Sequence, residues 1–152
     1  MAHDPEPLIG IDLGTTYSTV AYLDPHGRPI CLPNSEGDLL TPSVVYFEEN
    51  GPAIVGKEAI KAGLADPALM ADMVKRDMGK EVYHRPIRGK YLPPAAISGV
   101  ILHRLVEDAA TRTGPFKRAV VTVPAYFNEP RRKATMDAAR MAGLAEVELL
   151  NE

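Results

Sequence analysis

The chain has 152 residues, of which 45% are hydrophobic and 24% are charged, and its formal net charge is -3. These values are typical of one globular domain, and the acidic balance argues against a broad nucleic-acid surface. No stretch approaches the roughly 18–20 apolar residues of a membrane span. Cys31 is the only cysteine, which excludes an internal disulfide and a cysteine metal cluster. Because the N-terminus also lacks a signal-peptide pattern, we expect a cytoplasmic protein.

The first forty residues predict an antiparallel meander. We expect residues 1–7 to form a disordered lead-in. The apolar run at 8–13 indicates a buried strand, and the β-branched and aromatic run at 17–23 indicates a second. A turn at 24–28, with proline and glycine in suitable positions, leads to a third strand at 29–33.

The middle of the chain predicts a hairpin and two helices. Residues 41–56 have the pattern of a strand, a tight turn and a return strand. Two helical patches follow at 57–65 and 66–79, and the second begins with an Asp-Pro pair suited to a helix start and stops at Gly79. Residues 80–91 are polar, and we expect a surface loop or a weak hairpin.

The last third predicts a helix–strand–helix–strand order. The longest helix is expected at 93–114, with one apolar face. The continuous apolar run at 118–124 is typical of a strand covered on both faces. A helix at 128–144, with Asn128 as N-cap, connects it to a strand at 146–150, which should lie parallel to the strand before it. Together these elements predict a mixed sheet with an inserted, mostly helical subdomain.

The stretch "DLGTTYS" at 12–18 is the first candidate for chemistry. Glycine allows a phosphate close to the backbone, and threonine hydroxyls add donors. Asp12 lies between two aliphatic residues, where a carboxylate needs compensation. Magnesium, held through water, is one such compensation. A plain hairpin with a capping aspartate explains the same residues, so both interpretations remain open at this point.

Further motifs give the chain a family resemblance. "IGIDLGTTYSTVAYL" resembles the first phosphate loop of the actin, sugar-kinase and heat-shock ATPase superfamily. "VGKEAIKAGLADP", "KRDMG" and "AVVTVPAYFNEPRRKATMDAARMAGLAEVELLNE" are similar, in the same order, to the DnaK-type heat-shock chaperone family, heat shock protein 70. The resemblance runs from residue 9 to residue 152. It implies an α/β fold, lobe I of an actin-like, ribonuclease H-like ATPase, in which helices flank a mixed sheet.

The resemblance also implies a domain organisation. Residues 8–40 and 115–152 would form the core subdomain of lobe I, and residues 41–114 an inserted, smaller α+β subdomain. The second lobe, the second phosphate loop and the peptide-binding domain would lie outside this chain. As part of a chaperone that couples ATP hydrolysis to the binding of unfolded peptides, this lobe alone is expected to be inactive.

Site residues follow from the resemblance position by position. Asp12 would hold Mg²⁺ through water, and the backbone and hydroxyl groups of Gly14, Thr15, Thr16 and Tyr17 would cradle the β- and γ-phosphates of ATP or ADP. Thr15 would lie nearest the γ-phosphate and take part in catalysis. Without the resemblance, turn residues explain these positions equally well.

The catalytic and coupling residues lie in three other motifs. Lys75 would reach the γ-phosphate and the attacking water, and Glu152 would orient or deprotonate that water. Pro124 and Arg132 would form a relay to the substrate-binding half. By composition alone, Lys75 and Arg132 are ordinary solvated helix residues, Pro124 ends a strand and Glu152 is a frayed residue.

Partners and alternatives complete the expectations. A J-domain co-chaperone and a nucleotide exchange factor are implied, but Glu148 stands where many family members have a basic residue on the J-domain surface, which puts that coupling in doubt. No nucleic acid and no membrane are expected as partners. A sugar or glycerol kinase and an actin-like scaffold are the alternatives, and "VTVPAYFNE" argues against the kinase.

Overall fold

The computed structural model describes residues 6–152. Most of the expected lead-in, residues 1–5, lies outside the described residues. Its last part is held against the body of the chain, because the Glu6 carboxylate accepts a hydrogen bond from the backbone N–H of Lys117.

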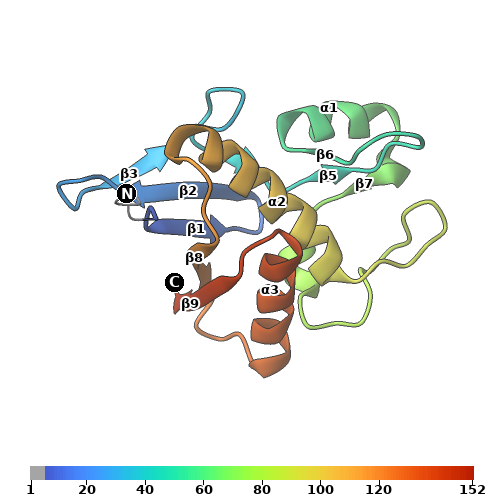
Figure 1. The fold of residues 1–152 in the computed structure, drawn as a ribbon. Helices are drawn as coiled ribbons and strands as arrows, with labels where there is room; N and C mark the ends of the chain where they lie inside the picture. The colour runs from blue at the N-terminus through green and yellow to red at the C-terminus, as the bar shows by residue number, and fades with distance from the viewer. Residues whose placement is uncertain (1–5) are drawn as a thin grey trace.

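A mixed sheet forms the centre of the molecule (Figure 1). The expected meander is confirmed, since the first three strands pair antiparallel in chain order. The two late strands then add in parallel on the other side of the first, giving the order β3-β2-β1-β8-β9, and a short strand β4 pairs with β2. The strands are β1 (Ile9–Leu13), β2 (Tyr17–Leu23), β3 (Pro29–Leu32), β4 (Thr41–Pro42), β8 (Arg118–Val123) and β9 (Glu146–Asn151).

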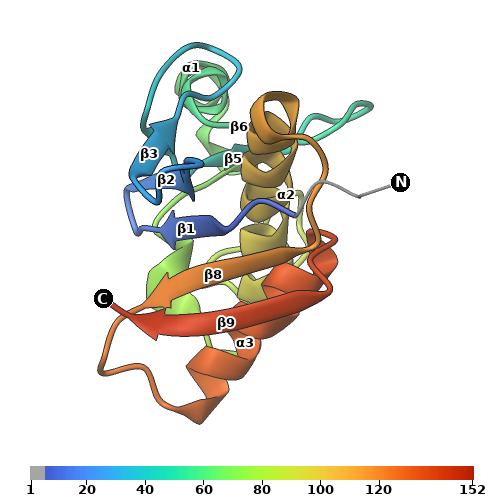
Figure 2. The ribbon, with the colours of Figure 1, turned by 60° about the vertical axis from the view of Figure 1, so that its left-hand side comes forward.

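Two helices cover one face of this sheet. The helices α2 (Pro94–Thr113) and α3 (Glu129–Met141) pack against each other on the same side of the strands (Figure 2). The side chains that point toward them form the core, among them Ile9, Ile11 and Val121, each 0% exposed.

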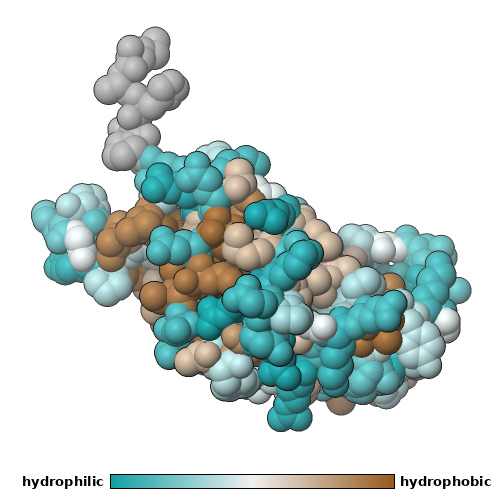
Figure 3. Space-filling view, turned by 90° about the horizontal axis from the view of Figure 1, so that it is seen from below, coloured by the Kyte–Doolittle hydropathy of each residue, from teal (hydrophilic) through white to brown (hydrophobic). Residues whose placement is uncertain are grey.

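The expectation that β8 is covered on both faces is wrong. Its residues alternate between buried and half-buried, because no helix of the described chain lies over the second face. Residues around this open side include Leu8 and Leu150, which are 53% and 56% exposed. In the view from below, hydrophobic side chains gather over one half of the surface, and the other half is largely hydrophilic (Figure 3).

A second, smaller sheet is built from the middle of the chain. The predicted hairpin is confirmed at its centre, where β5 (Val45–Tyr46) pairs antiparallel with β6 (Ile54–Val55). The strand β7 (Met70–Ala71) completes the order β6-β5-β7, and α1 (Lys57–Ala65) packs on all three strands. The helix α2 connects the two sheets, since it contacts β2 of the large sheet and both β5 and β6 of the small one.

The helix predicted at 66–79 is wrong. In its place are two 3₁₀ turns, η1 (Pro67–Leu69) and η2 (Val74–Asp77), separated by β7. The aspartate expected as N-cap makes no capping hydrogen bond. Met73 has a left-handed backbone with φ 54°, which no helix can accommodate. The cause is tertiary, because β7 gives its backbone hydrogen bonds to β5, and these outweigh a weak helix propensity.

The remaining helices begin and end close to their predicted limits. The side chain of Asn128 accepts a hydrogen bond from the backbone N–H of Arg131 at 3.2 Å, so it is the N-cap of α3 as predicted. The loop at 80–91 is irregular apart from a single bridge between Ile87 and Lys90. None of the helices in residues 6–152 is long and apolar enough to cross a membrane.

Candidate functional site

Three strands of the large sheet end at one edge. Because β8 pairs in parallel with both β1 and β9, the carboxyl ends of these strands lie together (Figure 2). The loop 14–16 follows β1, Pro124 follows β8, and Glu152 follows β9. In open α/β sheets, ligands bind beyond the carboxyl ends of the strands. The topology therefore brings three sequence-predicted positions to the edge where such a sheet binds ligands.

The loop 14–16 has a shape that its own backbone determines. A Cβ atom at Gly14 would overlap the carbonyl oxygen of Tyr17, so glycine is required there. The carbonyl of Thr16 accepts a hydrogen bond from the backbone N–H of Ser43 at 2.8 Å, which ties the loop to the next segment. Thr15 is half-buried, whereas Thr16 and Tyr17 are exposed. The loop is therefore a tight turn that leaves the side chains of Thr16 and Tyr17 exposed.

Asp12 lies on β1 with its carboxylate on the open face of the sheet. One of its oxygens accepts a hydrogen bond from the hydroxyl of Thr122 on β8 at 3.0 Å. Among residues 6–152, no three His, Cys, Asp or Glu side chains converge into a protein-built metal site. A magnesium ion at Asp12 would therefore take most of its ligands from water and from phosphate oxygens, as this ion commonly does.

Lys75 and Glu152 form an ion pair across 77 positions of sequence. The Lys75 Nζ and Glu152 Oε1 atoms are 2.7 Å apart. The lysine side chain is 11% exposed and the glutamate side chain 40% exposed, so the pair is partly shielded from water. The backbone N–H of Glu152 donates to the carbonyl of Val123 at 2.8 Å, which fixes the glutamate to the end of β8. A cation and a carboxylate are thus held together at the edge where the carboxyl ends of β1, β8 and β9 lie.

Pro124 and Arg132 lie next to residues that neighbour Glu152. Pro124 is buried immediately after β8, and its carbonyl accepts a hydrogen bond from Phe127 at 3.0 Å. Arg132, on α3, donates through Nε to the carbonyl of Phe127 at 2.9 Å and through Nη2 to Asn151 Oδ1 at 2.7 Å. Since Asn151 directly precedes Glu152, the guanidinium links the start of α3 to the end of β9.

Comparison with known proteins identifies the family. The family described as "Hsp70 protein" matches residues 8–152. The chain belongs to the Hsp70 family. It is 42% identical over 153 aligned positions to proteins named "Chaperone protein DnaK" from Thermotoga neapolitana, Thermotoga petrophila and Thermotoga maritima. Each match covers 100% of this chain and 26% of the relative, so the chain spans about a quarter of the length of these curated relatives.

The Hsp70 fold in this chain brings some predicted residues together and leaves others apart. Lys75 meets Glu152 directly, and Arg132 reaches the neighbouring Asn151. Within the described residues, no hydrogen bond or ion pair joins the loop 14–16 to the Lys75–Glu152 pair. A hollow of about 270 Å³ lies beside the loop, with Thr15 and Tyr17 on one wall and Met73, two residues before Lys75, on another. The loop and the segment leading to Lys75 therefore face a common space.

Two partners of the predicted residues were missed from the sequence. Thr122 donates to Asp12, and Asn151 accepts from Arg132. Thr122 was missed because the pairing of β1 with β8, whose parallel register aligns Gly10 with Val120, was not predicted from the sequence. For Asn151 no local signal exists, since its partner comes from a different element.

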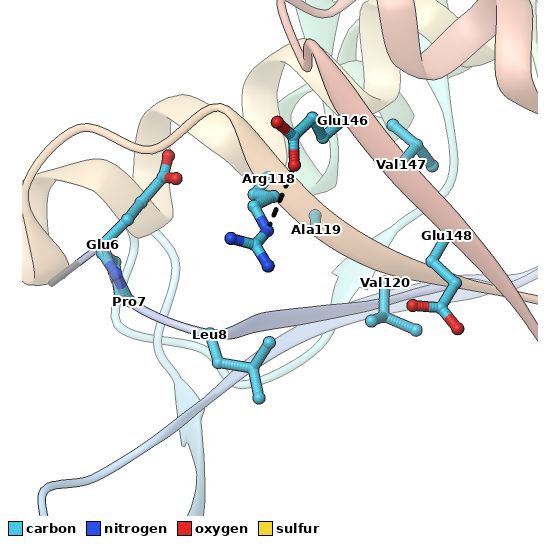
Figure 4. Close-up of a pocket in the computed structure, with 9 residues that line it drawn as sticks. All are labelled: Glu6, Pro7, Leu8, Arg118, Ala119, Val120, Glu146, Val147 and Glu148. Carbon is cyan, nitrogen blue, oxygen red and sulfur yellow. Dashed lines mark ion pairs between the residues drawn. The ribbon is translucent and has the colours of Figure 1, made fainter.

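A second hollow, of about 390 Å³, lies at the opposite edge of the sheet (Figure 4). Arg118 and Glu146, the first residues of β8 and β9, lie beside it, and their side chains form an ion pair with Nε and Oε2 3.3 Å apart. Leu8, Val120 and Glu148 also line it. Because it adjoins the amino ends of the strands, it is separate from the edge that carries the loop and Glu152.

Proposed function

We propose that this chain is the first lobe of an Hsp70-type chaperone ATPase and forms one wall of an ATP site. The observation that carries the proposal is the pairing of Lys75 with Glu152 at 2.7 Å, at the carboxyl edge of the sheet that also bears the glycine-threonine loop. The 42% identity to proteins named as DnaK chaperones supports it over a sugar kinase or an actin-like scaffold.

The phosphate-binding part of the proposal rests on Asp12 and the loop that follows it. Gly14, Thr15, Thr16 and Tyr17 would give backbone N–H and hydroxyl donors to the β- and γ-phosphates, and Thr15 would lie nearest the γ-phosphate. Asp12 would hold the hydration shell of Mg²⁺, steadied by Thr122. The fit of these residues to a phosphate rests on the tight turn at Gly14, where a Cβ atom would collide with the carbonyl oxygen of Tyr17. Bound ATP and Mg²⁺ would supply the transferable phosphoryl group and its charge compensation.

The catalytic part rests on Lys75 and Glu152. The Lys75 ammonium would neutralise charge on the γ-phosphate, and the Glu152 carboxylate would orient or deprotonate the attacking water. Their ion pair holds both groups at one place. We further propose that Pro124 and Arg132 transmit the state of this site, because Arg132 holds Asn151, the residue next to Glu152.

The decisive experiment uses a chimera in which residues 8–152 replace the matching segment of Thermotoga maritima DnaK. We expect this chimera to hydrolyse ATP, and we expect Glu152→Gln to lower its kcat strongly. Glu148→Gln removes an exposed carboxylate of β9, the strand that Glu152 follows, and is the matched control: it should leave the basal kcat, measured without a J-domain protein, unchanged. A chimera that folds but lacks ATPase activity would contradict the proposed function.

The 152-residue chain by itself is proposed to bind ATP weakly and to hydrolyse it negligibly. Its 8–40 and 115–152 segments are proposed as the core subdomain and residues 41–114 as the inserted one, and a second lobe would supply the adenosine contacts. Isothermal titration of the chain with Mg-ATP checks this, and tight binding would overturn it.

Partners of the whole protein are proposed on the resemblance alone. Unfolded peptides, a J-domain co-chaperone and a nucleotide exchange factor are the expected classes. Glu148 places an exposed negative charge on the surface of this chain that would bind the J-domain, where a positive charge is expected. We expect Glu148→Arg in the chimera to strengthen stimulation by a J-domain, and an unchanged or weaker response would argue against this assignment of the surface.

A further inference from the structure

Lys75 lies on a segment that cannot hold its own shape. The turn η2 has only four residues, and a single 3₁₀ turn is a weak element. Met73, directly before it, has a left-handed backbone at φ 54°, which costs free energy for a residue with a side chain. Contacts from elsewhere must therefore keep the backbone of Lys75 in place.

The hydroxyl of Tyr83 fixes the entry to this turn. It donates to the backbone carbonyl of Asp72 at 2.8 Å and accepts from the backbone N–H of the same residue at 3.2 Å. Tyr83 is 0% exposed, so its hydroxyl is costly to bury unless both bonds form. Burial raises the pKa of the Tyr83 hydroxyl, which keeps it protonated and able to donate over the ordinary pH range. One side chain thus clamps both polar groups of the residue before Met73.

The carboxylate of Asp77 fixes the exit. Asp77 is 4% exposed and is the last residue of η2. Its Oδ1 accepts from Lys80 Nζ at 3.0 Å, and its Oδ2 accepts from the backbone N–H of His84 at 3.0 Å and lies 2.7 Å from the His84 ring Nδ1. Because His84 is the neighbour of Tyr83, both ends of the Lys75 turn are tied to one short stretch of the following loop.

We propose that Tyr83 and Asp77 are positioning residues for Lys75, an inference that rests on the proposed role of Lys75 at the γ-phosphate. The loop 78–92 holds this segment at both ends: Tyr83 binds the backbone of Asp72, and His84 binds Asp77 at the end of η2. These contacts position Lys75 so that its ammonium lies 2.7 Å from the carboxylate of Glu152. The side-chain hydrogen bonds of Tyr83 and Asp77 within residues 6–152 go to Asp72, Lys80 and His84, and none goes to Glu152 or to the loop 14–16.

The first test observes Lys75 in the 152-residue chain by NMR, through the hydrogen exchange of its ammonium protons and its side-chain chemical shifts. Tyr83→Phe removes only the hydroxyl. We expect it to speed the exchange of the Lys75 ammonium protons about tenfold and to shift the Lys75 side-chain signals. Tyr91→Phe, in the same loop but 61% exposed, is the matched control and should change neither. Lys133, paired with Asp137 on the surface of α3, is the internal reference.

A second variant covers the case in which Tyr83→Phe does not fold. Asp77→Asn keeps the shape of the side chain but removes its charge. Its control is Asp66→Asn, because Asp66 is exposed and its side chain makes no capping hydrogen bond. The expected result is again a loosened Lys75 in Asp77→Asn alone. Unchanged Lys75 signals in a folded Tyr83→Phe or Asp77→Asn chain would overturn the proposal.

The third measurement separates this inference from the proposed function. In the chimera, Tyr83→Phe is expected to lower kcat about tenfold with little change in KM for ATP, because the lysine would be misplaced for the reaction. Loosened Lys75 signals together with an unchanged kcat would overturn the positioning role. An inactive chimera would count against the proposed function, and the NMR result would still decide whether Tyr83 and Asp77 hold Lys75.

Discussion

The two regions that face the candidate site are built in different ways. The strand-and-loop region at 9–23 is defined by its backbone, through regular pairing of β1 with β2 and a turn that only glycine can make at Gly14. The Lys75 region at 66–92 has little regular structure and is held by side chains, above all Tyr83 and Asp77. The first region could be predicted from local pattern, and the second could not.

This difference shows which parts of the structure local sequence can predict and which it cannot. A loop that closes between two paired strands has its residue types imposed by its own backbone, so its sequence is informative. A turn that is stabilised by non-periodic side-chain hydrogen bonds to the following loop carries no regular local signal, and the helix propensity of its own residues predicts a different structure. The candidate site therefore combines the region 9–23, which strand pairing holds in place, with the region 66–92, which specific side-chain hydrogen bonds hold in place.

The largest expected effect comes from removing the charge of Lys75 from the second region, which also breaks its ion pair with Glu152. In the chimera, Lys75→Met should lower kcat for ATP hydrolysis about 10²–10³-fold, the usual loss when a preorganised electrostatic group is removed. Arg76→Met, an exposed neighbour of the same type, should leave kcat within about twofold. Steady-state ATPase assays check both, and equal losses would show that the turn as a whole, rather than Lys75, matters.

The next effect tests whether the backbone defines the first region. Gly14→Ala should lower the free energy of unfolding of the 152-residue chain by about 1–3 kcal/mol, because the new methyl group would collide with the carbonyl of Tyr17. Gly10→Ala, on the strand that precedes the turn and with open space around it, should change it by less than about 0.5 kcal/mol. Urea unfolding compares the two variants, and similar losses would contradict a special role for the turn.

The N-cap of α3 tests a feature that was predicted from local sequence alone. Asn128→Ala should cost about 1 kcal/mol of unfolding free energy, since it leaves the backbone N–H of Arg131 without its capping acceptor. Asn128→Asp keeps an acceptor and should recover most of the loss. Thermal or urea unfolding measures both, and a neutral alanine variant would mean that the cap seen here contributes nothing.

The smallest effect is a pH dependence at the turn between β2 and β3. The backbone N–H of Arg28 lowers the pKa of Asp24 below its ordinary 3.8, burial opposes this, and the Arg28 guanidinium and the N–H of His26 lower it further. Because the folded-state pKa is lowered, the ionised carboxylate stabilises the fold above pH 3.8, and this stabilisation is lost as the pH falls through the folded-state pKa.

The matching measurement is urea unfolding across acidic and neutral pH for the parent chain and Asp24→Asn. The two should differ by a constant amount near neutral pH and converge in acid. A difference that does not depend on pH would show that the charge of Asp24 is not what stabilises the turn.

Much of the fold followed from local pattern. The three-stranded meander, the parallel arrangement of β8 and β9, and the cap of α3 were all expected and are all present. The errors share one origin. The helix predicted at 66–79 gave way to pairing between β7 and β5, and the double coverage predicted for β8 failed because helices lie on one face only. Both depend on which elements meet in space.

The candidate site divides in the same way. Asp12, the loop 14–16 and the residues of the "KRDMG" and "NE" motifs were selected from sequence and resemblance. Their roles toward a nucleotide remain predictions. The partners that hold them, among them Thr122, Asn151 and Tyr83, come from other elements and were not found in the sequence.

The sequence by itself determined the strand pattern, the glycine turn and the family to which the chain belongs, because hydrophobic alternation, turn chemistry and motif order are properties of neighbouring residues. Only the tertiary structure decided that Lys75 meets Glu152 across 77 positions, and that a buried tyrosine and aspartate hold the lysine there. The physical reason is that such contacts arise from the meeting of separate elements, and a single hydrogen bond between distant residues leaves no periodic trace along the chain.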